Sequence, residues 1–165
     1  MKFRRLDYLA EPLADLAAPS IRNLVSSAGG IDSVVPVPLH WRRRFHRGYD
    51  QAALLASALA RRLERPVSNV LRRVRATPAQ SLHDRSQRRR NLAGAFLVRT
   101  RAQALVRGRK ILLVDDVITT GATMEEAARE LRRSGALAVQ PFAIAWTPDE
   151  EEGDENPEEV DNRCV

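Results

Sequence analysis

ILLVDDVITTGAT, at residues 111–123, is the stretch that decides the fold of this chain. With Lys110 it begins as the apolar run KILLV, which predicts a strand buried on both faces of a parallel sheet. Two acids follow at the expected carboxyl end of that strand, and a turn of threonines and glycine then leads into a helix. Ligands of open α/β sheets bind beyond the carboxyl ends of strands, so the same stretch also predicts a ligand site.

The turn at residues 119–123 has the chemistry of a phosphate site. Successive backbone N–H groups and the N-terminus of the following helix both favour an anion. Glycine allows close backbone approach and unusual dihedral angles, and threonine hydroxyls donate further hydrogen bonds. The predicted phosphate-binding residues are Thr119, Thr120, Gly121, Ala122 and Thr123.

The two acids before this turn, Asp115 and Asp116, are expected to have a different role. As anions they would repel a phosphate. They are better suited to accept hydrogen bonds from ribose hydroxyls, or to hold water around a magnesium ion. A ligand with a phosphate at one end and a diol at the other satisfies both halves of the motif.

The motif has three other interpretations. A nucleotide hydrolase would carry the phosphate loop G-x-x-x-x-G-K-[ST], which this sequence lacks. A response regulator would place its paired aspartates near the amino terminus and a third aspartate after a later strand. The remaining interpretation, a capped helix after a buried strand with no ligand, leaves the combination of paired aspartates with TTGAT unexplained.

Strands and helices alternate around the motif. Residues 33–39 predict a strand end that passes into a loop, and residues 95–98 and 137–146 predict a short strand and a buried strand. Residues 72–91 are predicted to form a long loop or an added hairpin. The fold class predicted is a parallel α/β sheet flanked by helices. A helix over residues 50–63 is predicted from one apolar face: Ala52, Leu55, Ala56, Leu59 and Leu63.

The helix after the motif has the most complete local signals. Thr123 and Glu126 match a capping box, Glu125 and Arg129 match an i,i+4 pair, and Gly135 fits the position just past the helix end. A packing helix near the amino terminus, begun or kinked at a proline, is predicted from helical spacing of four leucines: Leu6, Leu9, Leu13 and Leu16, with Pro12.

Length and charge indicate one domain with a tail. The 165 residues, 44% of them hydrophobic, suit one compact domain over residues 1–148. Nine of the 21 acids fall in residues 149–161, so residues 149–165 are expected to be an acidic disordered tail. The remaining 26 bases and 12 acids leave the body at +14. That charge attracts phosphorylated metabolites and nucleic acid, or reflects arginines spread over solvated faces.

The cysteine content and the hydropathy pattern limit the cellular compartments in which the protein is expected. Cys164 is the only cysteine, which excludes a disulfide framework or a cysteine zinc site within one chain, and three scattered histidines make no metal site. Asp7 and Glu11 interrupt any signal-peptide core, and the longest uncharged run, residues 134–148, is too short to span a membrane. A soluble cytoplasmic protein is expected.

The segment VDDVITTGAT, residues 114–123, resembles the phosphoribosyl pyrophosphate signature of the type I phosphoribosyltransferases. The resemblance implies a Rossmann-like sheet with a small hood over the site. It implies that Asp115 and Asp116, the candidate catalytic residues, contact the ribose hydroxyls and that residues 119–123 wrap the 5′-phosphate. The implied cofactor is Mg²⁺, held through substrate and water and not by direct protein ligands.

Two further segments, at residues 35–56 (VPVPLHWRRRFHRGYDQAALLA) and 71–96 (LRRVRATPAQSLHDRSQRRRNLAGAF), resemble the ComF branch of that superfamily. The chain departs from the branch at Asp50, where asparagine is usual, and carries no N-terminal zinc ribbon. By this resemblance a loop lies against the pyrophosphate and an arginine-rich hood closes over the site. The residues implied are Val37, Pro38 and Leu39 in the loop, Arg47 nearby, and Arg75, Thr77 and Gln80 in the hood.

Aromatic residues and arginines alternate in HWRRRFHRGY at residues 40–49. This pattern fits a stacking surface for single-stranded DNA or, the interpretation we prefer, a hydrophobic edge beside the pyrophosphate loop. The function predicted is transfer of phosphoribosyl from phosphoribosyl pyrophosphate, with magnesium, to an unknown acceptor. The alternative is a non-catalytic competence-type protein that handles single-stranded DNA.

Overall fold

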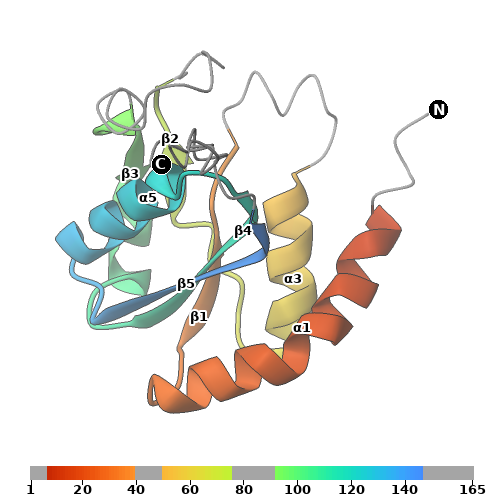
Figure 1. Cartoon of the computed structure of the whole chain (residues 1–165). Helices are drawn as coiled ribbons and strands as arrows, with labels where there is room; N and C mark the ends of the chain where they lie inside the picture. Colours follow the sequence, from red (N-terminus) through yellow and green to blue (C-terminus); the bar gives the residue numbers. More distant parts are fainter. Residues whose placement is uncertain (1–6, 40–49, 76–91, 147–165) are drawn as a thin grey trace, which may run out of the picture.

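The computed structural model describes residues 7–39, 50–75 and 92–146. Its centre is a parallel sheet of order β1-β4-β5, built from β1 (Ser33–Pro36), β4 (Lys110–Ile118) and β5 (Ala138–Trp146). Helices α1 (Asp7–Ser27) and α3 (Gln51–Leu63) lie on one side of the sheet and α5 (Ala122–Arg133) on the other (Figure 1). The predicted parallel α/β fold is confirmed.

Strand β4 is buried on both faces, as its apolar run predicts. Ile111 and Leu113 belong to the core cluster on the α5 side, whereas Leu112 and Val114 belong to the cluster shared with α1 and α3. Strand β1 pairs with it from Ser33–Ile111 to Pro36–Val114. A strand between two neighbours and two helical layers has no polar face, which explains the absence of alternation.

The ends of the central strands differ from the sequence prediction. Strand β4 continues through the two acids to Ile118 because β5 pairs with it as far as Trp146. Strand β5 was predicted to be buried, and this is wrong: of its residues only Val139 is buried, and Trp146 is 68% exposed. In the described part of the chain β5 has one strand neighbour, so it forms an edge of the sheet.

Helix α1 packs against α3, but of the predicted leucine stripe only Leu13 packs against the shared core cluster, and it is partly buried. Leu9 is 48% and Leu16 is 80% exposed, and Leu6 lies outside the described residues. Small side chains let two helices approach closely, and the alanine face therefore forms the buried part of the contact. Two prolines lie inside the helix, whose direction changes along its length (Figure 1). The buried residues of α1 are Ala14, Ala17, Ala18 and Ile21.

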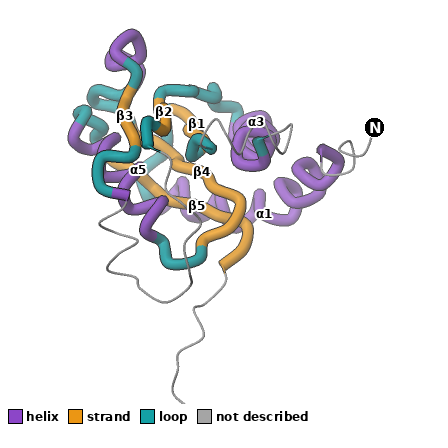
Figure 2. Tube along the Cα trace, turned by 90° about the horizontal axis from the view of Figure 1, so that it is seen from above, coloured by secondary structure: helices purple, strands orange, loops and turns teal. Residues whose placement is uncertain are grey.

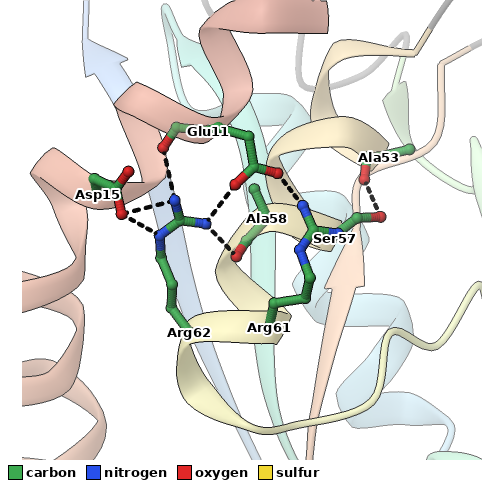
Figure 3. Close-up of polar contacts among 7 residues, drawn as sticks. All are labelled: Glu11, Asp15, Ala53, Ser57, Ala58, Arg61 and Arg62. Atoms are coloured by element: carbon green, nitrogen blue, oxygen red, sulfur yellow. Dashed lines mark hydrogen bonds and ion pairs between the residues drawn. The ribbon is translucent and has the colours of Figure 1, made fainter.

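A polar clamp joins α1 to α3 on the surface (Figure 3). Arg62 donates to the side chains of Asp15 at 2.7 Å and Glu11 at 2.9 Å, and also to the carbonyl of Ala58 at 2.9 Å. Arg61 forms a second ion pair with Glu11. Hydrogen bonding to Arg62 lowers the pKa of the Glu11 carboxyl. The clamp therefore holds the crossing of the two helices from outside the core.

Helix α5 differs from its sequence prediction at the start and agrees at the end. Its N-cap is Gly121 with no side-chain cap, so the predicted capping box is wrong. Arg129 forms an ion pair with Glu126, three residues before it. At the other end Gly135 has φ +94° and its N–H donates to the carbonyl of Arg132, while the next N–H donates to Leu131. This is the Schellman motif that a glycine at C′ predicts.

A small hairpin packs beside α5, and the stretch after it leads back to the sheet. Strand β2 (Leu71–Arg73) pairs antiparallel with β3 (Phe96–Val98), and the short helix η1 (Thr100–Leu105) follows. Phe96 is almost fully buried in the cluster that includes α5. Of residues 72–91, predicted as a long loop or an added hairpin, the structure describes residues 72–75. Residues 76–91 and the predicted tail at 149–165 lie outside the described residues. Within the described ranges no helix has the length and apolar content needed to cross a membrane.

Candidate functional site

A pocket opens where β4 ends and α5 begins. Viewed from above (Figure 2), the ends of β4 and β5 run side by side, and the loop after β4 turns back into α5. The pocket therefore combines a strand end, a loop and a helix N-terminus, the three parts that the motif predicts. Its lining residues are Asp115, Val117, Ile118, Thr119, Thr120, Gly121, Thr123 and Met124.

Asp115 is the acid that lines this pocket. Its side chain accepts a 2.9 Å hydrogen bond from the backbone N–H of Asp116, whose own side chain accepts one of 2.9 Å from Val117. Burial, followed by hydrogen bonding to and the charge of Asp116, raises the pKa of Asp115 to about 8. The charge of Asp50 adds to this rise. An acid in this state gains from any ligand that supplies hydroxyl donors or a nearby cation.

The loop at residues 119–121 leads from β4 into α5 and ends in a glycine. Gly121 has φ +75°, a left-handed conformation that favours glycine, and the N–H of Glu125 closes the first turn onto its carbonyl at 2.9 Å. A Cβ at Gly121 would meet no protein atom within 4 Å. The space beside this glycine is therefore open to a ligand. Ala122 is buried as the first residue of α5, so it can contribute only its backbone N–H to such a site.

The loop after β1 reaches the same edge of the sheet. The N–H of Val37 donates to the carbonyl of Val114 at 2.8 Å, directly before Asp115. Val37 is buried, while Pro38 and Leu39 are partly exposed. The structure thus brings the predicted pyrophosphate loop next to the predicted ribose-binding acid.

The ComF branch usually has asparagine at the position of Asp50, and the sequence assigned this residue no role. The structure places it at the start of α3. It is the N-cap of α3, and its side chain accepts a 3.2 Å hydrogen bond from the N–H of Ala53. Asparagine caps helices equally well, so the exchange preserves the cap and adds a negative charge near Asp115. The signal for this cap was present in the sequence, an acid directly before an apolar helical face.

The predicted hood residues are less well placed. Arg75 lies just after β2, where its guanidinium donates to the carbonyl of Ala93 at 3.2 Å across the hairpin. The other two hood residues, Thr77 and Gln80, lie outside the described residues, as does Arg47, which was predicted to lie near the pyrophosphate loop. The role of these four residues remains a prediction.

Two buried acids of α5 were not anticipated. Glu126 accepts from the N–H of Gly94 at 2.8 Å, and Glu130 accepts from the N–H of Val98 at 3.0 Å. Each carboxylate also pairs with the arginine three residues later. Nothing in the sequence distinguishes these glutamates from solvent-facing ones, because their partners are backbone groups of a distant hairpin.

The described residues do not build a metal site of their own. Among residues 7–39, 50–75 and 92–146 no group of three or more histidine, cysteine or acidic side chains is arranged to hold a metal ion. Asp115 and Asp116 supply oxygen donors suited to magnesium, but they are too few for a cage of protein ligands. A magnesium ion bound here would take most of its ligands from substrate oxygens and water, as the motif resemblance implies.

Comparison with known proteins identifies relatives of this chain. A model of the phosphoribosyl transferase domain matches residues 50–165. DNA utilization protein YhgH of Escherichia coli K12 is 37% identical over 150 residues, which cover 89% of this chain and 64% of that protein. Competence protein F of Haemophilus influenzae is 38% identical over 115 residues, covering 69% and 50%. Competence protein ComFC of Bacillus subtilis is 36% identical over 112 residues, covering 67% and 43%. The chain spans less than two thirds of the length of each of these relatives.

Solved structures share the fold at lower identity. Glutamine phosphoribosylpyrophosphate amidotransferase of B. subtilis, complexed with ADP and GMP, is 21% identical with a TM-score of 0.51, over 84% of this chain and 26% of that one. Hypoxanthine phosphoribosyl transferase of Trypanosoma cruzi is 14% identical with a TM-score of 0.51, over 86% and 75%. The family match, the named relatives and the fold lead to one conclusion: this chain belongs to the phosphoribosyltransferase domain family and, within it, to the ComF branch.

Proposed function

We propose that this chain binds phosphoribosyl pyrophosphate in the pocket between β4 and α5. The observation that carries the proposal is the placement of Asp115 in the same pocket as the glycine loop that begins α5. The loop offers backbone N–H groups and a helix N-terminus to a phosphate, and the acid offers oxygen acceptors to a diol. A sugar phosphate has both groups on one small molecule.

The orientation of the ligand follows from charge. The 5′-phosphate lies on the loop formed by Thr119, Thr120 and Gly121, because the loop and the helix N-terminus offer it N–H donors, whereas the strand end offers carboxyl oxygens. The ribose hydroxyls then face Asp115 and Asp116. The pyrophosphate group extends toward the backbone of residues 37–39, with Arg75 and magnesium as the countercharges. The threonines at positions 119, 120 and 123 line this pocket, and their hydroxyls can donate further hydrogen bonds to the phosphate.

The reaction proposed is transfer of the phosphoribosyl group to a nucleophile. The acceptor attacks the anomeric carbon as the bond from that carbon to the pyrophosphate oxygen breaks, and pyrophosphate leaves with the bonding electrons. Positive charge develops on the ribose and negative charge on the leaving group. Carboxylates beside the ribose and cations beside the pyrophosphate stabilise these charges. Magnesium, when bound, supplies further charge to the leaving oxygens.

Ligand binding tests the proposal directly. Phosphoribosyl pyrophosphate with magnesium should raise the melting temperature, because a ligand that binds only the native state stabilises it by mass action. Ribose 5-phosphate and pyrophosphate, added singly, should give smaller shifts. The Asp115→Ala, Asp116→Ala double variant should fold and lose the shift. No shift at millimolar ligand would refute the proposal.

A second candidate function is the handling of single-stranded DNA. It is favoured by the names of the relatives, a DNA utilization protein and two competence proteins, and by the chain's sequence pI of about 10.6. A catalytic protein should release pyrophosphate only when an acceptor is added. A DNA-handling protein should bind oligonucleotides with an affinity that falls steeply as the salt concentration rises. It should release no pyrophosphate.

A further inference from the structure

Two buried acids of α5, Glu126 and Glu130, have no role in the function proposed above. Glu126 and Glu130 are 9% and 7% exposed, and Ser33 is the other buried polar residue of the described ranges. Both glutamates lie on the face of α5 that meets the β2–β3 hairpin. Burying a carboxylate is costly unless hydrogen bonds and a countercharge compensate, and both glutamates have such partners.

Glu126 differs from Glu130 in what lies beyond its hydrogen bond. The N–H that it accepts belongs to Gly94, and the carbonyl of the same peptide group, on Ala93, accepts the guanidinium of Arg75 at 3.2 Å. One peptide group therefore lies between the Arg75 cation and the Glu126 anion. A peptide polarised from both ends makes a stronger donor and a stronger acceptor.

The same helix carries the phosphate loop. Thr123, which lines the pocket, precedes Glu126 by three residues, or about one helical turn. A short path thus runs from the pocket through the first turn of α5 and the Ala93–Gly94 peptide to Arg75. Arg75 uses one of its five N–H donors on this peptide, which leaves others for a ligand.

We propose that Glu126 is a positioning residue, which sets where Arg75 lies relative to the phosphate loop at residues 119–121. The inference rests on the proposed function, since Arg75 matters only if an anionic ligand occupies the pocket. In the function proposed above Arg75 is a countercharge of the pyrophosphate, so a change at Glu126 would affect that end of the ligand through Arg75. The 5′-phosphate end depends on the loop alone.

Glu130 provides the matched control. It accepts from a backbone N–H of the same hairpin at 3.0 Å and pairs with Arg133 at 2.9 Å, one turn farther along α5. Its partner in the hairpin is Val98, the last residue of β3, whereas Ala93 lies before the first residue of that strand. A role limited to holding the hairpin against the helix would make the two glutamates equivalent.

The experiment compares ligand affinities by calorimetry for wild type, Glu126→Ala, Glu126→Gln, Glu130→Ala, Arg75→Ala and the Arg75→Ala, Glu126→Ala double variant. Glu126→Ala should weaken phosphoribosyl pyrophosphate binding about tenfold, the size expected for a lost charge-assisted contact, and leave ribose 5-phosphate binding within about twofold. Glu126→Gln retains an acceptor for Gly94 and should recover most of the affinity. Glu130→Ala should leave both affinities within about twofold.

The double variant decides whether Glu126 acts through Arg75. If it does, the double variant binds no more weakly than Arg75→Ala alone. Equal losses in Glu126→Ala and Glu130→Ala, or a further loss in the double variant, would overturn the inference.

Ligand-free measurements separate this inference from the proposed function. Amide hydrogen exchange at Gly94 and tryptic cleavage after Arg75 should both speed up in Glu126→Ala, and cleavage after Arg75 should not change in Glu130→Ala. If wild type binds no ligand, the proposed function is refuted. The rates of amide exchange at Gly94 and of cleavage after Arg75 would still test whether Glu126 positions Arg75. Unchanged rates in Glu126→Ala would refute that role even if wild type binds.

Discussion

The side chain of Asp115 accepts a hydrogen bond of 2.9 Å from the backbone N–H of Asp116, its neighbour on β4. Burial and the neighbouring acid together raise the pKa of Asp115 to about 8, from an ordinary value of 3.8. Below that pH the empty site therefore holds a proton on Asp115. The consequences differ for folding and for binding, and both can be measured.

The first prediction concerns stability against pH. Because the pKa of Asp115 is higher in the folded than in the unfolded chain, the folded state holds the extra proton between about pH 4 and pH 8. The free energy of unfolding should fall as pH rises through that window. Asp115→Asn cannot ionise, so it should match wild type near pH 4 and melt higher near pH 8. Thermal unfolding across this range checks it, and parallel curves would contradict it.

The second prediction concerns ligand binding against pH. Ribose hydroxyls and a magnesium ion both favour the ionised carboxylate, so binding should expel the proton from Asp115. The affinity for phosphoribosyl pyrophosphate should rise with pH up to about 8 and then level off. Calorimetry in buffers of different ionisation enthalpy measures the protons released. Asp116→Asn removes the neighbouring charge, so it should shift the midpoint of this rise to lower pH. An affinity independent of pH from 6 to 9 would exclude a role for this proton.

The third prediction compares two glycines. Gly121 and Gly108 have φ +75° and +69°, and a Cβ at either position would meet no protein atom within 4 Å. Alanine should therefore cost about 1–2 kcal/mol of stability at each site through backbone strain alone. Only Gly121→Ala should also weaken ribose 5-phosphate binding, because its methyl group enters the pocket. Denaturant unfolding and calorimetry on both variants test this, and equal affinities would place the phosphate elsewhere.

The fourth prediction concerns the clamp between α1 and α3. Arg62 contacts both Glu11 and Asp15 with a side chain that is 16% exposed, whereas Arg61 contacts Glu11 alone and is 62% exposed. Arg62→Ala should lower the melting temperature more than Arg61→Ala, since exposed ion pairs contribute little. Added salt should reduce the difference in melting temperature between wild type and Arg61→Ala at lower concentrations than the difference between wild type and Arg62→Ala. A larger effect of Arg61→Ala in thermal melts would contradict this order.

The sequence was sufficient for the elements whose signals are local. An unbroken apolar run predicted the central strand β4, the glycine after the acids predicted the turn into α5, and Gly135 predicted the end of α5. Each of these signals acts through backbone conformation or burial within a few residues. Such local preferences do not depend on how the rest of the chain folds, and they can therefore be predicted from the sequence without a structure.

Tertiary structure decided which of two equivalent patterns was used. Helix α1 has a leucine face and an alanine face at the same helical spacing, and only the approach of α3 selected the alanine face around Ala14 and Ile21. Strand β5 is as apolar as β4, but its position at an edge of the described sheet leaves Trp146 exposed. The roles of Glu126 and Asp50 depend on groups 32 and about 65 residues away, Gly94 and Asp115. The sequence determined the chemistry available at the site, and the fold determined which charges lie close enough to change it, because electrostatic and hydrogen-bond partners are set by distance in space.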